Sequence, residues 1–225
     1  MSYFNSLLFG IYPYIAILIC LVGSWIRFDR EPYTWKASSS QLLRNKGMRV
    51  ASNLFHVGII FILAGHFVGL LTPQEVYHAF ISTESKQLLA MVSGGLFGLI
   101  CLVGIVMLLQ RRFTDPRIRA TSSMSDNLIL VLLFVQLVLG LLTIFASAQH
   151  MDGSVMVQLG IWAQSIVTFQ ATKAAMAIES VNIIYKLHVF LGLTILLLVP
   201  FSRLVHVISA PVWYLGRRYQ VVRQR

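Results

Sequence analysis

Acidic side chains and cysteines are scarce in this 225-residue sequence. Only 8 residues are Asp or Glu, and charged residues make up 12% of the chain, about half the roughly 25% found in an average soluble domain. The two cysteines, Cys20 and Cys101, stand in separate apolar stretches, and no Cys-x-x-Cys spacing occurs. Cysteine-based zinc sites, redox dithiols and iron–sulfur clusters are therefore excluded, and both cysteines are expected to be small core residues.

A stripe of basic and aromatic residues clear of the apolar segments is also missing, so the formal net charge of +10 does not indicate nucleic-acid binding. Hydrophobic residues instead make up 57% of the chain. They gather in five blocks of about 20 residues, each long enough to cross the hydrocarbon core of a bilayer as a helix. The sequence therefore predicts an all-α, polytopic membrane protein, a five-helix bundle that forms one domain over residues 1–225. The expected spans are residues 4–26, 50–71, 87–110, 127–147 and 183–207, and residues 155–171 are expected to form a helix along the membrane surface.

Lysine and arginine are distributed unevenly among the connections between these spans. Fifteen of the 18 fall in the first connection, the third connection and the C-terminal end, and only Lys86, Lys173 and Lys186 fall on the other side. Cytoplasmic connections of membrane proteins retain positive charge. We therefore expect the N-terminus outside the cytoplasm and the C-terminus inside it.

Four of the six histidines fall inside the spans, where an ionisable side chain is costly and usually has a function or a partner. His56 and His66 lie in the second span, and His188 and His206 lie in the fifth. Because these spans run in opposite directions, depth in the membrane pairs His66 with His188 on the outer side and His56 with His206 on the inner side. Facing imidazoles suit axial ligation of haem iron, so the pattern indicates two b-type haems in the bundle core. The haems would be held non-covalently, since Cys-x-x-Cys-His is absent.

The spacing of the histidines supports this interpretation only in part. From His188 to His206 an ideal helix advances about 27 Å and returns to the same face, whereas from His56 to His66 it advances about 15 Å and turns roughly 80° away. Unequal helix tilts, inclined haem planes and a kink at Pro200, between the two histidines of the fifth span, could absorb the difference. Unrelated polar packing of the four histidines stays open as the alternative.

Several segments spread along the chain form a distinctive set. They are IYPYIA (11–16), the GSW, YTW and SSSQ elements within 23–43, SNLFHVG (52–58), GHFVGLLTP (65–73), ASAQHMDGS (146–154), WAQSIVTF (162–169) and LHVFLGLTILLLVPFSRLVH (187–206). With them the chain resembles the gamma chain, the cytochrome b subunit, of bacterial respiratory nitrate reductase. The resemblance implies that His56, His66, His188 and His206 are the axial ligands of two b haems, in the pairs given above.

The resemblance also implies a function in the bacterial cytoplasmic (inner) membrane. Such a subunit oxidises a membrane quinol near the outer face and sends the electrons through two haems to a cytoplasmic iron–sulfur subunit and a molybdenum catalytic subunit. The chain has no cysteine cluster that could hold an iron–sulfur centre. We therefore expect it to be the subunit that receives electrons from quinol and anchors the complex in the membrane.

Three further basic residues are candidates for binding a ligand. Lys86, at the start of the third span, could hydrogen-bond a quinone oxygen near Gly65 and His66, or could simply extend its ammonium to the interface. The resemblance implies the first, because the matching lysine belongs to the quinol pocket. Arg112 and Arg203, at the inner ends of the third and fifth spans, could pair with haem propionates or anchor the chain at the cytoplasmic face.

Two rival interpretations follow from the same features. One is a similar di-haem bundle attached to another oxidoreductase, such as a sulfur-compound or heterodisulfide reductase. The other is a haem-free transporter in which the four histidines relay protons near the midplane. The identity of the cytoplasmic subunits that co-purify with the chain would distinguish the first alternative from a nitrate reductase subunit. A redox difference spectrum would distinguish the second, because a transporter would show no haem bands.

Overall fold

A computed structural model describes residues 3–37, 39–209 and 216, and every element among them is helical. Five stretches are long and apolar enough to cross a membrane: residues 3–30, α3 (Met48–Leu71), α5 (Thr83–Thr114), α7 (Met124–Ala148) and residues 183–201. The first stretch comprises α1 (Tyr3–Ser6), the π-turn η1 (Leu7–Ile11) and α2 (Tyr12–Arg30), and the last comprises α10 (Ile183–Leu198) and η3 (Val199–Phe201). The shorter elements are η2 (Pro32–Thr34), α4 (Gln74–Tyr77), α6 (Pro116–Thr121), α8 (Ser154–Val167), α9 (Ala171–Ala177) and η4 (Arg203–Val207). The predicted all-α membrane fold with five long helices is confirmed.

Four of the connections end in a side chain that caps the next helix. These caps are Ser82, Asp115, Ser123 and Asn182, each of which accepts a hydrogen bond from a backbone N–H of the first turn that follows. Polar side chains at this position satisfy N–H groups that have no partner within the helix. The caps therefore determine where α5, α6, α7 and α10 begin.

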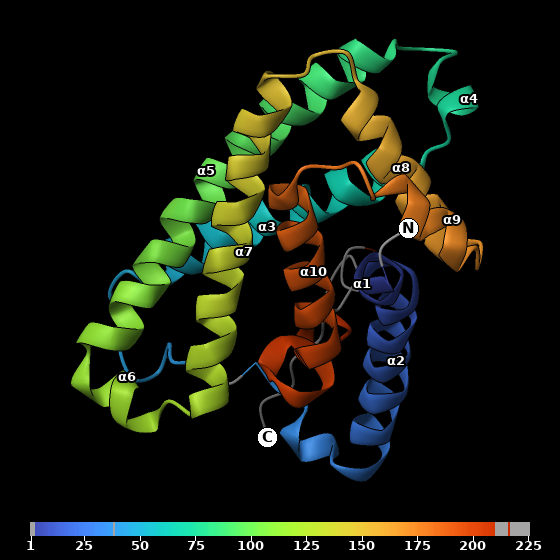
Figure 1. The fold of residues 1–225 in the computed structure, drawn as a ribbon. Coiled ribbons are helices and arrows are strands. Elements are labelled where there is room, and N and C mark those ends of the chain that lie inside the picture. The colour runs from blue at the N-terminus through green and yellow to red at the C-terminus, as the bar shows by residue number, and fades with distance from the viewer. Residues whose placement is uncertain (1–2, 38, 210–215, 217–225) are drawn as a thin grey trace.

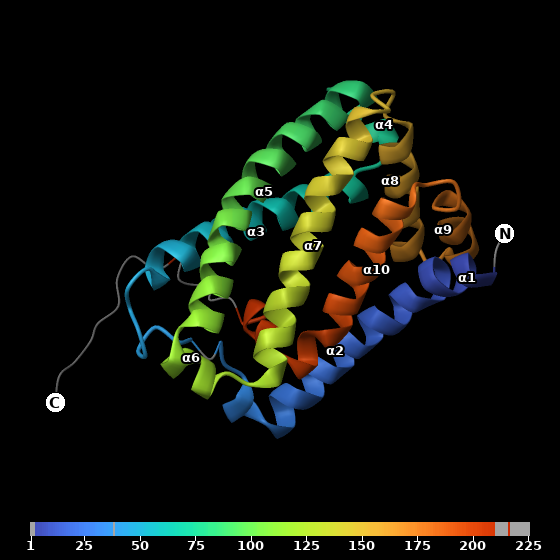
Figure 2. The same cartoon turned by 60° about the vertical axis from the view of Figure 1, so that its left-hand side comes forward.

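The long helices follow one another as neighbours, α5 beside α7, α7 beside α10 and α10 beside α2 (Figures 1 and 2). Helix α3 crosses behind α7 in both views and packs against α5 and α8. A Cβ at Gly58 would lie 2.5 Å from the Cβ of Cys101, so only glycine permits this approach of α3 to α5. Cys20 and Cys101 are buried and unpaired, as small core residues should be.

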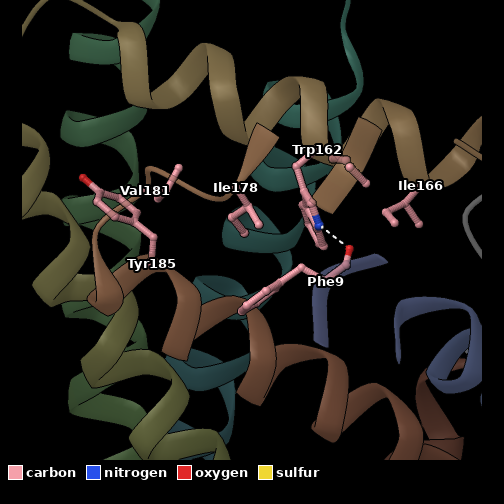
Figure 3. Close-up of a cluster of buried hydrophobic side chains, with 8 residues drawn as sticks. Phe9, Trp162, Ile166, Ile178, Val181 and Tyr185 are labelled. Atoms are coloured by element: carbon pink, nitrogen blue, oxygen red, sulfur yellow. Dashed lines mark hydrogen bonds between the residues drawn. The ribbon is translucent and has the colours of Figure 1, made fainter. Parts of the chain in front are cut away.

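A buried apolar cluster joins α8 and α9 to the N-terminal π-turn (Figure 3). Its members include Phe9, Trp162, Ile178 and Tyr185, and the indole Nε1 of Trp162 donates a hydrogen bond to the carbonyl oxygen of Phe9 at 3.0 Å. The helix expected within residues 155–171 is therefore present as α8, and it packs its tryptophan into the protein. The cluster closes one end of the bundle, next to the start of α10.

The fifth span is not one continuous helix. Helix α10 ends at Leu198, Pro200 lies in the short turn η3, and Ser202 is fully extended with φ −131° and ψ −179°. The chain then forms η4, which carries His206. The kink expected at Pro200 is a complete break, because proline lacks the N–H that would continue the helix and Ser202 leaves the helical conformation.

Candidate cofactor-binding site

The four candidate ligand histidines meet in two pairs, between α3 on one side and the segment from α10 to η4 on the other. The ring centroids of His66 on α3 and His188 on α10 lie 6.0 Å apart, and those of His56 on α3 and His206 on η4 lie 6.3 Å apart. These are the pairs expected from the opposite directions of the two spans. The structure thus brings together all four residues that the sequence singled out as ligands.

Both separations suit a metal ion between the rings. Because an imidazole nitrogen binds a first-row metal at about 2.0 Å and lies roughly 1 Å from its ring centroid, a shared metal requires centroids about 6 Å apart. Rings in direct van der Waals stacking would lie closer together. The observed distances therefore fit bis-histidine ligation, and they also fall within the roughly 4.5–7 Å range of tilted and edge-to-face ring contacts.

Three of the four rings have one nitrogen engaged by the backbone. The Nδ1 atoms of His56, His66 and His206 lie 2.7, 2.8 and 2.5 Å from the carbonyl oxygens of Ser52, Ile62 and Arg203, respectively. A carbonyl only accepts, so each Nδ1 carries the proton and donates it. This tautomer leaves the lone pair on Nε2, which is the arrangement typical of metal-binding histidines.

His188 is supported by α7 instead. A Cβ at Gly140 would lie 2.9 Å from the Cε1 atom of His188, so the imidazole packs directly on the backbone of α7. The side-chain amide nitrogen of Gln136, one turn earlier, lies 3.5 Å from the Nε2 atom of His188. Nδ1 of His188 is buried and has no hydrogen-bond partner among the described residues. Sequence reasoning missed Gln136, although a lone amide within an apolar span was a signal that could have identified it.

The number of ligands also limits the kind of cofactor. Among the described residues, no group of three or more His, Cys, Asp or Glu side chains could hold a metal ion. Two histidines per site leave most coordination positions to be filled by something other than the protein. Haem fits this donor set, since its porphyrin supplies four nitrogens and the protein supplies the axial ligands.

Arg112, at the C-terminal end of α5, and Arg203, in η4, share the carboxylate of Asp126. Nε of Arg203 donates to Asp126 Oδ1 at 2.7 Å, and Nη1 of Arg112 lies 3.9 Å from Asp126 Oδ2. Arg112 is buried and also donates to the hydroxyl of Ser122 at 2.8 Å. Arg203 lies three residues before His206 in η4. Sequence reasoning found both arginines but missed Asp126, which connects them.

Lys86 and Gly65 lie on the two sides of the connection between α3 and α5. Nζ of Lys86 lies 3.6 Å from the centroid of the Tyr77 ring, a cation–π contact that holds the ammonium near the N-terminal end of α5. At Gly65, which precedes His66 on α3, an added Cβ would meet no atom within 4 Å. Gly65 is therefore an exposed position of α3 with open space around it.

Comparison with known proteins identifies the family. The model of the nitrate reductase gamma subunit family matches residues 5–225. The chain is similar to the respiratory nitrate reductase 1 gamma chain of Escherichia coli (strain K12), with 54% identity over the full length of both proteins. It belongs to the nitrate reductase gamma subunit family. It is also 50% identical to the respiratory nitrate reductase 2 gamma chain of the same organism and 37% identical to the nitrate reductase gamma chain of Bacillus subtilis (strain 168), over at least 98% of each protein.

This membership confirms the resemblance inferred from the sequence segments. Nitrate reductase gamma subunits are membrane cytochromes of the b type, and the chain is accordingly an integral protein of the bacterial inner membrane and an electron-transport subunit of a nitrate reductase complex. The two rival interpretations, another oxidoreductase or a haem-free transporter, have no support in these comparisons.

Proposed function

We propose that this gamma subunit binds two haems b and uses them to carry electrons from a quinol near the outer face to cytoplasmic partner subunits. The observation that carries the proposal is the pair of bis-histidine arrangements, His66 with His188 and His56 with His206, at metal-bridging distance. Haem bound at the two sites would supply one-electron transfer in two stages across the membrane. The chain's own contribution is to hold each pair of imidazoles and, at His56, His66 and His206, to select the tautomer that presents Nε2.

The inner pair is supported by the shared-carboxylate cluster of Arg112, Arg203 and Asp126. Both guanidinium groups lie at the carboxylate of Asp126, and Arg203 belongs to the same short helix as His206. Guanidinium pairs with carboxylates in a planar, two-point geometry, which suits a propionate. The cluster is therefore assigned to the propionates of the inner haem.

The quinol site is assigned to Lys86, Gly65 and His66. The Lys86 ammonium, held on the ring of Tyr77, can donate a hydrogen bond to a quinol oxygen. Gly65 is exposed next to His66 in the sequence, and an added Cβ there would meet no atom within 4 Å, so a ligand could approach α3 at this turn. Oxidation of a quinol releases two electrons and two protons. If the protons leave outside while electrons move inward, charge moves against the membrane potential, at about 2.3 kcal/mol per charge for each 100 mV.

The cytoplasmic face offers the contact for an iron–sulfur subunit and a molybdenum catalytic subunit. The connection after α2 is fastened to the inner end of α5, because Arg44 pairs with Asp115 at 2.6 Å and Arg111 donates to the carbonyl oxygens of Ser40 and Lys46 at 2.9 and 3.2 Å. An ordered basic surface of this kind suits docking. The tail at 211–225 is basic and aromatic, and we expect it to contribute to the same contact; it lies outside the described residues apart from Gly216.

Haem stoichiometry tests the proposal most directly. The pyridine haemochrome of the purified complex should show two haems b per gamma chain, His66→Ala or His188→Ala should each remove one, and His56→Ala or His206→Ala should each remove the other. His150→Ala, which changes an exposed histidine in the connection before α8, is the matched control and should retain both. Two haems that survive all four intramembrane changes would refute the assignment.

A further inference from the structure

The break after α10 creates a structural problem for the inner histidine pair. His206 lies in η4, beyond the extended Ser202, so the α-helix that carries His188 does not determine the position of His206. A helix interrupted by proline also leaves carbonyl oxygens without the N–H groups that would follow in a regular helix. Something other than α10 must therefore hold η4 in place opposite α3.

A single guanidinium on α2 meets this break. Nη1 of Arg27 donates to the carbonyl oxygens of Pro200 and Ser202 at 2.7 and 2.8 Å. The same group donates from Nη2 to the carbonyl oxygen of Thr34 at 2.9 Å and from Nε to the Thr34 hydroxyl at 3.1 Å. Arg27 therefore ties together the end of α2, the turn η2 and the segment that leads into His206.

The backbone of α2 approaches the same break. At Gly23, one turn before Arg27 and on the same face of α2, an added Cβ would lie 3.0 Å from both the Cβ and the Cγ of Pro200. The two positions act together: Gly23 lets α2 approach the proline, and Arg27 binds the carbonyl oxygens on either side of Phe201. Charge-assisted hydrogen bonds of this kind are the stronger ones, and they strengthen further where water is excluded.

We propose that Arg27, with the close approach at Gly23, is a positioning residue for His206 and thereby for the inner haem. This inference rests on the proposed function, in which His206 is an axial ligand. Positive charge at a cytoplasmic helix end is explained by membrane orientation alone, but orientation does not account for a guanidinium directed at two carbonyl oxygens in the break between α10 and η4. Arg30, exposed in the same last turn of α2, provides a matched comparison because it carries the same charge at the same membrane face.

The test compares Arg27→Gln, Arg27→Lys, Gly23→Ala and Arg30→Gln in the assembled complex. Haem per chain, the low-spin electron paramagnetic resonance signal of each ferric haem and the midpoint potential of each haem are measured. Arg27→Gln should alter the signal and potential of the inner haem or reduce haem content from two towards one, and leave the outer haem unchanged. Arg27→Lys, which keeps the charge and can reach one carbonyl, should restore part of the native signal. Gly23→Ala should produce a smaller shift of the same haem, and Arg30→Gln should produce none.

Each contrary result has a definite meaning. Unchanged signals and potentials in Arg27→Gln, or equal changes in Arg27→Gln and Arg30→Gln, would overturn the inference. Loss of both haems in Arg27→Gln would also overturn it, because Arg27 would then support the whole bundle rather than one ligand. His206→Ala separates the two proposals: if that variant keeps both haems, the ligand assignment itself fails, whatever Arg27 does.

Discussion

Replacing Gly140 by alanine should disturb the outer haem site and leave the inner one intact. The new Cβ would lie 2.9 Å from Cε1 of His188, whereas ordinary contacts begin near 3.4 Å. The imidazole must therefore move by several tenths of an ångström, which exceeds the roughly 0.2 Å tolerance of metal–ligand distances. Loss of support around a metal ligand commonly weakens metal binding by about 10- to 100-fold.

The Gly140→Ala variant is informative because it should weaken haem binding while it increases the intrinsic stability of α7. Alanine in a helix interior is more favourable than glycine by about 1 kcal/mol, so α7 by itself should become more stable. Haem per chain should fall from two towards one, and the remaining outer haem should change its midpoint potential. Gly94→Ala on α5, where an added Cβ meets nothing within 4 Å, serves as the control. Native haem content and potentials in Gly140→Ala would refute the contact with His188.

Three further predictions concern the outer site, the inner surface and the core. Lys86→Ala should lower the rate of quinol oxidation while both haems remain, and an unchanged rate would exclude Lys86 from the quinol site. The hydrogen bond from Arg44 lowers the pKa of Asp115 from its ordinary 3.8, so the Arg44–Asp115 ion pair is fully present above pH 3.8 and is lost as the pH falls through the lower pKa of the folded state. Asp115→Asn removes this ion pair and should accelerate limited proteolysis of residues 39–47 at pH 7. Equal cleavage rates in the variant and the native protein would contradict a role of the ion pair in holding this segment. Trp162→Phe, which leaves the Phe9 carbonyl oxygen without its donor, should destabilise the solubilised protein by about 1–3 kcal/mol in thermal unfolding, and an unchanged melting temperature would contradict this.

The membrane fold and the histidine pairs could be predicted because they depend on properties that the sequence displays directly. Span length and apolar composition determine how many helices cross the bilayer. Because successive spans run in opposite directions, the position of each histidine along its span determines its depth in the membrane. Only one pairing joins histidines of equal depth: His66 with His188, and His56 with His206. No distance between helices was needed for either step.

The supports of these ligands could not be predicted, because they come from residues far away in the sequence. Gly140 and Gln136 lie on α7, and nothing in their local pattern shows that α7 packs beside His188. Asp126 is a single acidic residue near the start of a span, and only the folded chain brings it between two arginines. Such contacts depend on helix order and rotation, which hydropathy does not determine.

The histidines of the second and fifth spans are spaced differently, and this difference already indicated that the bundle departs from regular, straight helices. In ideal helices the two ligands on α3 would lie about 15 Å apart, and the two on the fifth span about 27 Å apart. The chain resolves the conflict by ending α10 at Leu198 and turning at Ser202, so that His206 meets His56 from a separate segment. A ligand placed beyond a break needs a support of its own, which is why the guanidinium of Arg27, rather than the helix that carries His188, should govern the inner site.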